Sequence, residues 1–100
     1  MAIAFIQEFK IEGDDRTTTN YDAINERLTQ EDAPAGLLIH FAGFDEDAGV
    51  FRIVNVWETR QQGQQYLDEK VLPTVREVLP GGGRQAERET AYELHHVAKP

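Results

Sequence analysis

The segment from Val50 to Glu58, VFRIVNVWE, constrains the fold most, because it has the length of a β-strand and is apolar in both of its registers. Successive side chains of a strand point to opposite faces of a sheet. The odd positions carry Phe, Ile, Asn and Trp, and the even positions carry Val, Arg, Val and Val. An antiparallel strand with one solvated face would show polar residues on that face. The pattern therefore predicts a sheet that is covered on both sides.

Three elements are predicted before this strand. Residues 1–9 are rich in Ile and Phe and form a first strand, and residues 36–43 form an apolar strand that a loop at 45–49 joins to the strand at 50–58. A helix lies between them, stops before Pro34, and carries an apolar stripe made of Tyr21, Ile24 and Leu28.

Two elements are predicted after it. Thr59 and Gln62 match a capping box, so a second helix starts at Thr59. Pro73 either kinks this helix or begins a second short helix at its first position, and Pro80 with the glycines at 81–83 ends it. The last strand is predicted over Thr90–Val97.

The order strand, helix, strand, strand, helix, strand is that of the ferredoxin-like α+β fold, a split βαβ arrangement. It predicts one domain over residues 1–100, with a four-stranded antiparallel sheet and helices on one face. Helices leave the second face uncovered, and a second copy of the chain is the simplest cover. We therefore predict a homodimer.

Composition narrows the function classes. The net charge is −8, which repels phosphate backbones and anionic lipid head groups, so neither nucleic acid nor a membrane is a predicted partner. The absence of cysteine removes thiolate metal sites and thiol nucleophiles and fits a reducing compartment. Gln7 and Glu8 interrupt what would be a signal sequence. The expected location is cytoplasmic.

Two segments, YDAINERL at Tyr21–Leu28 and the stretch Val54–Val75, make the chain resemble the dimeric α+β barrel superfamily, and within it the antibiotic biosynthesis monooxygenase-like group. The resemblance covers essentially the whole chain, and its most specific parts are Trp57-Glu58-Thr59 and Leu72-Pro73. It implies a homodimeric barrel with a cavity between sheet and helices in each protomer. It implies no single reaction, because the superfamily includes quinone-forming oxygenases, haem-handling enzymes, small isomerases and members with no known activity.

Two departures from the pattern of the haem-degrading members argue against haem. Those members use a helix histidine as the axial ligand, where this chain has Tyr66-Leu67, and a first-strand Asn, where this chain has Gln7 or Glu8. We therefore predict no cofactor.

His40, Asn55 and Trp57 are the strongest candidates for chemistry. His40 lies mid-strand and is predicted to share a face with Leu38 and Ala42; it is either a core histidine bonded to a neighbour or a general base for a phenolic proton. Asn55 and Trp57 share a face of the next strand. The Asn55 amide would hold a developing oxyanion and the indole would form a flat apolar wall, as cofactor-free attack of dioxygen on an aromatic carbanion requires. The alternative roles are a satisfied buried amide and a core or interface aromatic.

Three further residues are weaker candidates. Tyr66 and Phe41 are predicted to help bind a substrate, with plain packing as the alternative for Tyr66. Arg52 is predicted on the face opposite Asn55, as a salt bridge to Glu58 or Glu93 or as a group that captures a substrate anion.

No metal or phosphate site is predicted. His95 and His96 are adjacent in the predicted last strand, so their rings would point to opposite faces and not share an ion. The acidic run 45–47 lacks the spaced ligands of a calcium loop, and the glycines at 81–83 follow a helix instead of preceding one.

Two hypotheses follow. In the first, the homodimer binds a small apolar, aromatic or polyketide-like molecule and oxidises or isomerises it without a cofactor. In the second, it is a non-catalytic binding or assembly module in which the same residues only pack. A void of a few hundred Å³ lined by His40 and Asn55 favours the first, and a close-packed interior favours the second.

Overall fold

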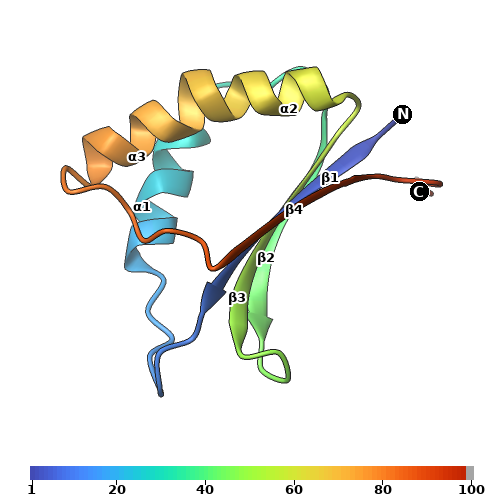
Figure 1. The fold of residues 1–100 in the computed structure, drawn as a ribbon. Helices are drawn as coiled ribbons and strands as arrows, with labels where there is room; N and C mark the ends of the chain where they lie inside the picture. Colours follow the sequence, from blue (N-terminus) through green and yellow to red (C-terminus); the bar gives the residue numbers. More distant parts are fainter. Residues whose placement is uncertain (99–100) are drawn as a thin grey trace.

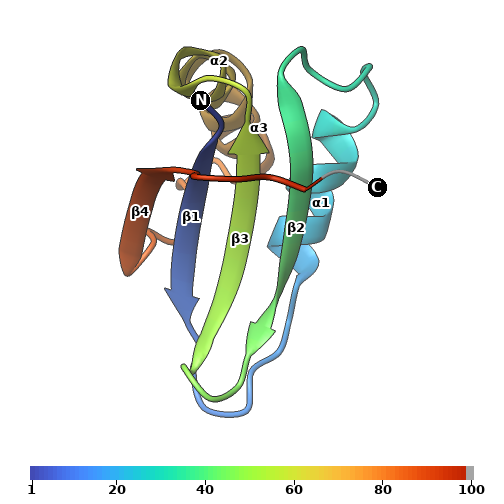
Figure 2. The same ribbon diagram turned by 90° about the vertical axis from the view of Figure 1, so that its right-hand side faces the viewer.

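The computed structural model describes residues 1–98 and contains one four-stranded antiparallel sheet in the order β2-β3-β1-β4 (Figure 2). The strands span β1 Ile3–Lys10, β2 Leu37–Asp45, β3 Val50–Trp57 and β4 Arg88–Glu93. The helical elements are α1 Thr19–Leu28, α2 Arg60–Tyr66, the π-helical turn η1 Leu67–Val71, and α3 Leu72–Val78. All of them lie on one side of the sheet (Figure 1). The predicted ferredoxin-like α+β fold is confirmed.

The second helix begins where the sequence predicts. Thr59 is its N-cap, and its hydroxyl accepts a hydrogen bond from the backbone N–H of Gln62 at 3.2 Å. The segments α2, η1 and α3 follow one another as a continuous rod across the sheet (Figure 1). Pro73 lies in the first turn of α3, directly after the π-helical turn. Pro73 is the second residue of α3, one position later than the predicted first position, and its missing N–H falls in the first turn of that helix.

The hairpin between β2 and β3 is closed by Asp45 and Gly49. The Asp45 carboxylate accepts from the N–H of Ala48 at 3.0 Å, and the Gly49 N–H donates to the Asp45 carbonyl at 2.9 Å. Gly49 has a φ of 71°, a conformation that favours glycine. This turn sets the register in which His40 pairs with Asn55.

The last strand is shorter than predicted and begins earlier. It pairs with β1 from Glu8↔Arg88 to Ile3↔Glu93, and β1 has no strand residues beyond Ile3 for it to pair with. The Leu94 N–H makes one more hydrogen bond, to the carbonyl of Ala2 at 2.8 Å, and the chain then runs across the front of the sheet in Figure 2. The prediction of a strand through Val97 is therefore wrong. His95 and His96 do not lie in a strand, so the argument that placed their rings on opposite faces does not apply.

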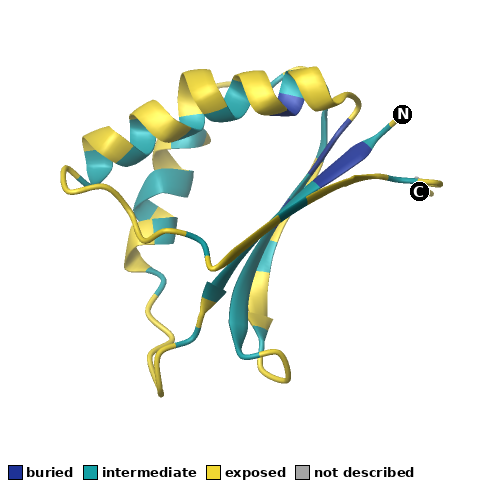
Figure 3. Ribbon diagram, viewed as in Figure 1, coloured by how far each residue is buried: buried dark blue, intermediate teal, exposed yellow. Residues whose placement is uncertain are grey.

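Burial concentrates at one end of the sheet, beneath the start of α2 (Figure 3). The buried apolar residues are Ile3, Ala4, Val54, Val56 and Trp57. Ala4, Val54 and Val56 face away from the helices, and partly buried residues pack against them: Ala2, Ile6, Leu38 and Leu94. At the other end of the sheet the helices cover a hollow space.

Candidate functional site

The space between helices and sheet is a cavity of about 1160 Å³. Drug-sized ligands occupy pockets of about 300–1,000 Å³, so the cavity accommodates a molecule of several rings. His40 and Asn55 both line it. Most of its wall is apolar, from Phe5, Phe9, Ile24, Leu28, Ile53, Leu67, Val71, Val75 and Leu79. A hollow interior lined by His40 and Asn55 favours the ligand-binding hypothesis over the close-packed one.

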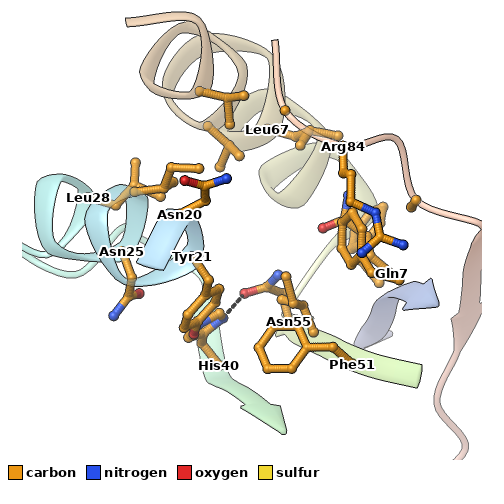
Figure 4. A pocket seen from close by; sticks show the side chains of 18 of the residues that line it. Gln7, Asn20, Tyr21, Asn25, Leu28, His40, Phe51, Asn55, Leu67 and Arg84 are labelled. Carbon is orange, nitrogen blue, oxygen red and sulfur yellow. Dashed lines mark hydrogen bonds between the residues drawn. The ribbon is translucent and has the colours of Figure 1, made fainter. Parts of the chain in front are cut away.

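Three side chains from three elements form one hydrogen-bonded chain at the cavity wall. Tyr21 comes from α1, His40 from β2 and Asn55 from β3. Tyr21 Oη lies 2.6 Å from His40 Nε2, and His40 Nδ1 lies 2.6 Å from Asn55 Oδ1 (Figure 4). Because α1 packs over the β2–β3 hairpin, residues 19 and 15 positions apart in sequence meet here.

The partners of His40 set its tautomer. The amide oxygen of Asn55 only accepts hydrogen bonds, so His40 Nδ1 carries the hydrogen and donates it. In the neutral ring Nε2 then holds a lone pair, and it accepts the hydrogen of the Tyr21 hydroxyl. His40 is thus presented as a base at Nε2, with its ring held by Asn55.

Tyr21 is a neutral phenol in this setting. Burial raises its pKa above the usual value of 10.0, and the negative charge of Asp22 adds to the effect. The ring of Phe51 meets the Tyr21 ring edge to face, with centroids 5.4 Å apart and planes at 74°. The predictions did not include Tyr21 in the site, because at helical spacing it counts as one more member of the apolar stripe of α1.

A β-bulge between Leu37 and Ile39 changes which β2 residues share the cavity face with His40. His40 pairs with Asn55 and lines the cavity, and Ala42, which pairs with the cavity-lining Ile53, lies on the same face of β2, as predicted. Leu38 instead packs against Ala4, Val54 and Val56 on the other face. A bulge adds one residue to one strand and breaks the strict alternation of faces, so the predicted placement of Leu38 beside His40 is wrong.

Phe41 also lies on the other face, opposite Val54, and is 52% exposed. It does not line the cavity. Its predicted place in a substrate site is therefore wrong for a simple reason: it directly follows His40 in a strand, and successive side chains point to opposite faces.

Trp57 and Tyr66 line the cavity at the junction of β3 and α2. Their ring centroids are 5.3 Å apart, and Trp57 is buried. A side chain at Gly63 would come within 2.5 Å of the Phe5 ring and 2.7 Å of the Trp57 ring, so α2 approaches the sheet closely only with glycine there. Burial raises the pKa of the Tyr66 phenol, with a further contribution from Glu31.

Gln7 and Arg84 lie across the pocket from Tyr21 and His40 (Figure 4). Gln7 donates to the Glu89 carboxylate at 3.3 Å, and the Arg84 guanidinium donates to the carbonyl of Lys10 at 2.7 Å. This side of the pocket is therefore polar. Neither Gln7 nor Arg84 was predicted from the sequence to line a cavity.

Arg52 lies on the face opposite Asn55, as predicted, with other partners than those predicted. Its guanidinium pairs with Glu8 at 2.6 Å and with Asp45 at 2.7 Å. Glu8 lies directly across the ladder from Arg52, and Asp45 closes the adjoining hairpin. The hydrogen bond from Arg52, followed by one from the Ala48 backbone, lowers the pKa of Asp45 below its usual value of 3.8. Arg52 faces away from the cavity, so it is no anion receptor there.

Among residues 1–98, no three or more His, Asp or Glu side chains are grouped so as to hold a metal ion. In the same residues, no helix is both long enough and apolar enough to cross a membrane.

No protein-family model matches the chain, and no curated protein matches it. Solved structures match it over nearly its whole length. Rv0793 from Mycobacterium tuberculosis has a TM-score of 0.68 and 16% identity, over 99% of this chain and 100% of that one. SnoaB from Streptomyces nogalater, described as a cofactor-independent oxygenase, has a TM-score of 0.64 and 14% identity, over 96% and 95%. A candidate antibiotic biosynthesis monooxygenase from Nitrosomonas europaea has a TM-score of 0.67 and 13% identity, over 96% and 100%.

The chain has the fold of the antibiotic biosynthesis monooxygenase-like proteins. The predicted resemblance is thereby confirmed at the level of the fold. Identities of this size carry no reaction from one protein to another, since one fold hosts many chemistries. Function has to be argued from the cavity and its side chains.

Proposed function

We propose that the cavity binds a small, mostly apolar aromatic molecule and that the chain removes a proton from it without a cofactor, with His40 as the base. The observation that carries the proposal is the Asn55–His40 hydrogen bond of 2.6 Å inside an apolar-walled cavity of about 1160 Å³. A packing histidine needs no such cavity. A base needs a defined tautomer, a lone pair at the cavity side and a partner that stabilises the imidazolium.

Asn55 has two functions in this proposal. Its Oδ1 fixes His40, and in the described part of the chain its Nδ2 group makes no hydrogen bond to the protein. That N–H group is free to donate to an oxyanion that develops on the bound molecule. Trp57 and Tyr66 form the aromatic wall, where flat rings stack.

The reaction that fits best is a monooxygenation with dioxygen as the only oxidant. Removal of a proton from an anthrone or from its phenolic form leaves a phenolate-type anion, whose negative charge is shared with a ring carbon. Dioxygen then oxidises a ring methylene to a carbonyl, with one oxygen atom in the product and the other in water. The description of SnoaB as a cofactor-independent oxygenase supports this choice, and isomerisation of the same anion is the alternative reaction.

A homodimer is part of the proposal. On the sheet face away from the helices, Ile39, Phe41 and Tyr92 are 52%, 52% and 50% exposed. Ile39 and Phe41 lie on the edge strand β2 and Tyr92 on the edge strand β4, and exposed apolar side chains of this size mark protein contacts on otherwise polar surfaces. The same patch on a second copy would cover them by two-fold symmetry.

Thermal unfolding of the purified protein tests ligand binding, with phenols and anthrones as probes and with flavin and haem as controls. A ligand at a hundred times its dissociation constant adds about 2.7 kcal/mol to the native state, which raises Tm by about ten degrees in a domain of this size. We expect the rise with aromatic phenols or anthrones and none with the two cofactors. No rise with any of them would favour the non-catalytic binding or assembly module.

A further inference from the structure

The ring nitrogens of His40 are both engaged within the protein. Nδ1 is bonded to Asn55 Oδ1 and Nε2 to Tyr21 Oη, each at 2.6 Å. An imidazole has no third site for a hydrogen bond. A molecule in the cavity therefore has no direct access to the base while the chain of three residues is intact.

Tyr21, unlike His40, can still accept a hydrogen bond from a bound molecule. A phenol hydroxyl has one hydrogen to donate and two lone pairs that accept. Tyr21 donates its hydrogen to His40 Nε2, and among residues 1–98 its Oη has no other hydrogen-bond partner. The residue lines the cavity, so these lone pairs are open to a bound molecule.

Displacement of Tyr21 by a ligand is the competing route, and the packing opposes it. The Tyr21 ring is half-buried and is held edge to face by Phe51, which lies on the sheet. Its helix α1 also packs against α3 and is tied to it by the Arg27–Glu77 ion pair. The phenol would have to break its hydrogen bond and leave the Phe51 contact before a ligand reached Nε2.

We infer that Tyr21 is a catalytic residue of this site: it contacts the ligand hydroxyl and relays the proton to His40, with Asn55 behind both. This inference rests on the proposed function. In the step, the ligand O–H bond breaks and its proton passes to Tyr21 Oη, while the hydrogen of Tyr21 passes to His40 Nε2. The ligand keeps the electron pair as a phenolate, Tyr21 is unchanged, and His40 becomes an imidazolium that donates to Asn55 and Tyr21. The substrate class is accordingly a phenol or enol.

The test uses 4-nitrophenol, whose neutral and ionised forms absorb at different wavelengths. Its bound ionised fraction is measured in the wild type, in Tyr21→Phe, in His40→Gln and in Tyr92→Phe. Tyr92 lies on the other face of the sheet, so the last variant is the matched control. In the wild type and in Tyr92→Phe, we expect the ionised fraction of the bound probe to exceed that of the free probe in water at the same pH. Tyr21→Phe and His40→Gln should each lower the ratio of ionised to neutral bound probe about tenfold, which is one pKa unit.

A wild-type ratio in Tyr21→Phe, together with the loss in His40→Gln, would show that the probe reaches His40 directly and would overturn the relay. A probe that binds the wild type but whose ionisation does not respond to His40→Gln would instead overturn the proposed function, and the relay with it. Failure of the probe to bind the wild type would also count against both.

Nitrogen NMR of the His40 ring is a second test, because it shows directly which ring nitrogens carry a hydrogen. In the wild type we expect the hydrogen on Nδ1, and we expect the probe to add one on Nε2. In Tyr21→Phe the probe should leave Nε2 unprotonated. Protonation of Nε2 by the probe in that variant would contradict the relay.

Discussion

The two faces of the sheet are built from the same strands and differ in almost every other respect. The face toward the helices carries His40 and Asn55, and a cavity of about 1160 Å³ lies above it. The opposite face carries Val54 and Val56, each 7% exposed, and on its edge strands the exposed apolar side chains of Ile39, Phe41 and Tyr92. One face therefore holds polar groups in a defined geometry beside open space, while the other holds packing and contact residues together with the ion pairs of Arg52. The proposed function therefore assigns different roles to adjacent residues of one strand, and substitutions of neighbours test this directly.

The largest difference is expected in the reaction rate, between substitutions of His40 and of its neighbour Phe41 on β2. His40→Ala should lower the reaction rate by about 10²–10⁴-fold, the usual contribution of a general base. Phe41→Ala, the matched control on the other face, should change the rate by less than about threefold. The rate is measured as oxygen uptake or isomer formation with a ligand found by thermal unfolding. An unchanged rate in His40→Ala would remove His40 from the mechanism.

The next difference concerns stability and the neighbours Val54 and Ile53 on β3. Val54→Asp places an unpaired carboxylate in the buried cluster with Ala4 and Val56, so the free energy of unfolding should fall by more than about 3 kcal/mol. Ile53→Asp points into the cavity, where the charge keeps contact with water, and should cost at least about 1 kcal/mol less. Urea unfolding measures both. Equal losses would mean that the two faces do not differ in packing.

A smaller effect is expected on assembly. Ile39→Glu adds a charge to the exposed apolar patch and should raise the dissociation constant of the homodimer by more than about tenfold. Gln61→Glu adds the same charge on the exposed side of α2 and should leave the constant unchanged. Light scattering over a dilution series gives the mass. A wild-type mass of 11.3 kDa at micromolar concentration would show that the homodimer proposal is wrong.

The smallest effect is expected in how the stability of the fold depends on pH under acidic conditions. The pKa of Asp45 lies below its usual value of 3.8 in the folded chain because of Arg52, so the unfolded chain binds the proton more readily. The stability from this group is present above pH 3.8 and is lost as the pH falls through the folded pKa. Asp45→Asn should therefore make Tm less dependent on pH below about pH 4, whereas Asp47→Asn in the same hairpin should behave as the wild type. An unchanged acid dependence in Asp45→Asn would mean that the ion pair with Arg52 is absent in solution.

Local patterns were sufficient for most of the fold and for part of the site. The alternation in Val50–Glu58, the cap at Thr59 and the turn before Gly49 each depend on neighbours in sequence, and the structure has all three. The same alternation placed Asn55 and Trp57 on one face, and both line the cavity.

Tertiary structure decided the rest, because the deciding contacts join residues far apart in sequence. The bulge after Leu37 turned Leu38 away from His40, and alternation alone does not reveal a bulge. The last strand ends at Glu93 because its partner there, Ile3, is the first residue of β1. The sequence of β4 alone does not indicate this end.

The sequence by itself determined that this protein is a ferredoxin-like sheet with a histidine and an amide on neighbouring strands, since strand and helix periods are local. Only the tertiary structure decided that helix α1 leaves a cavity above them and brings the Tyr21 hydroxyl to within 2.6 Å of His40. The position of a helix over a sheet is set by packing along the whole interface, and a phenol on an apolar stripe looks the same in sequence whether it packs or transfers a proton.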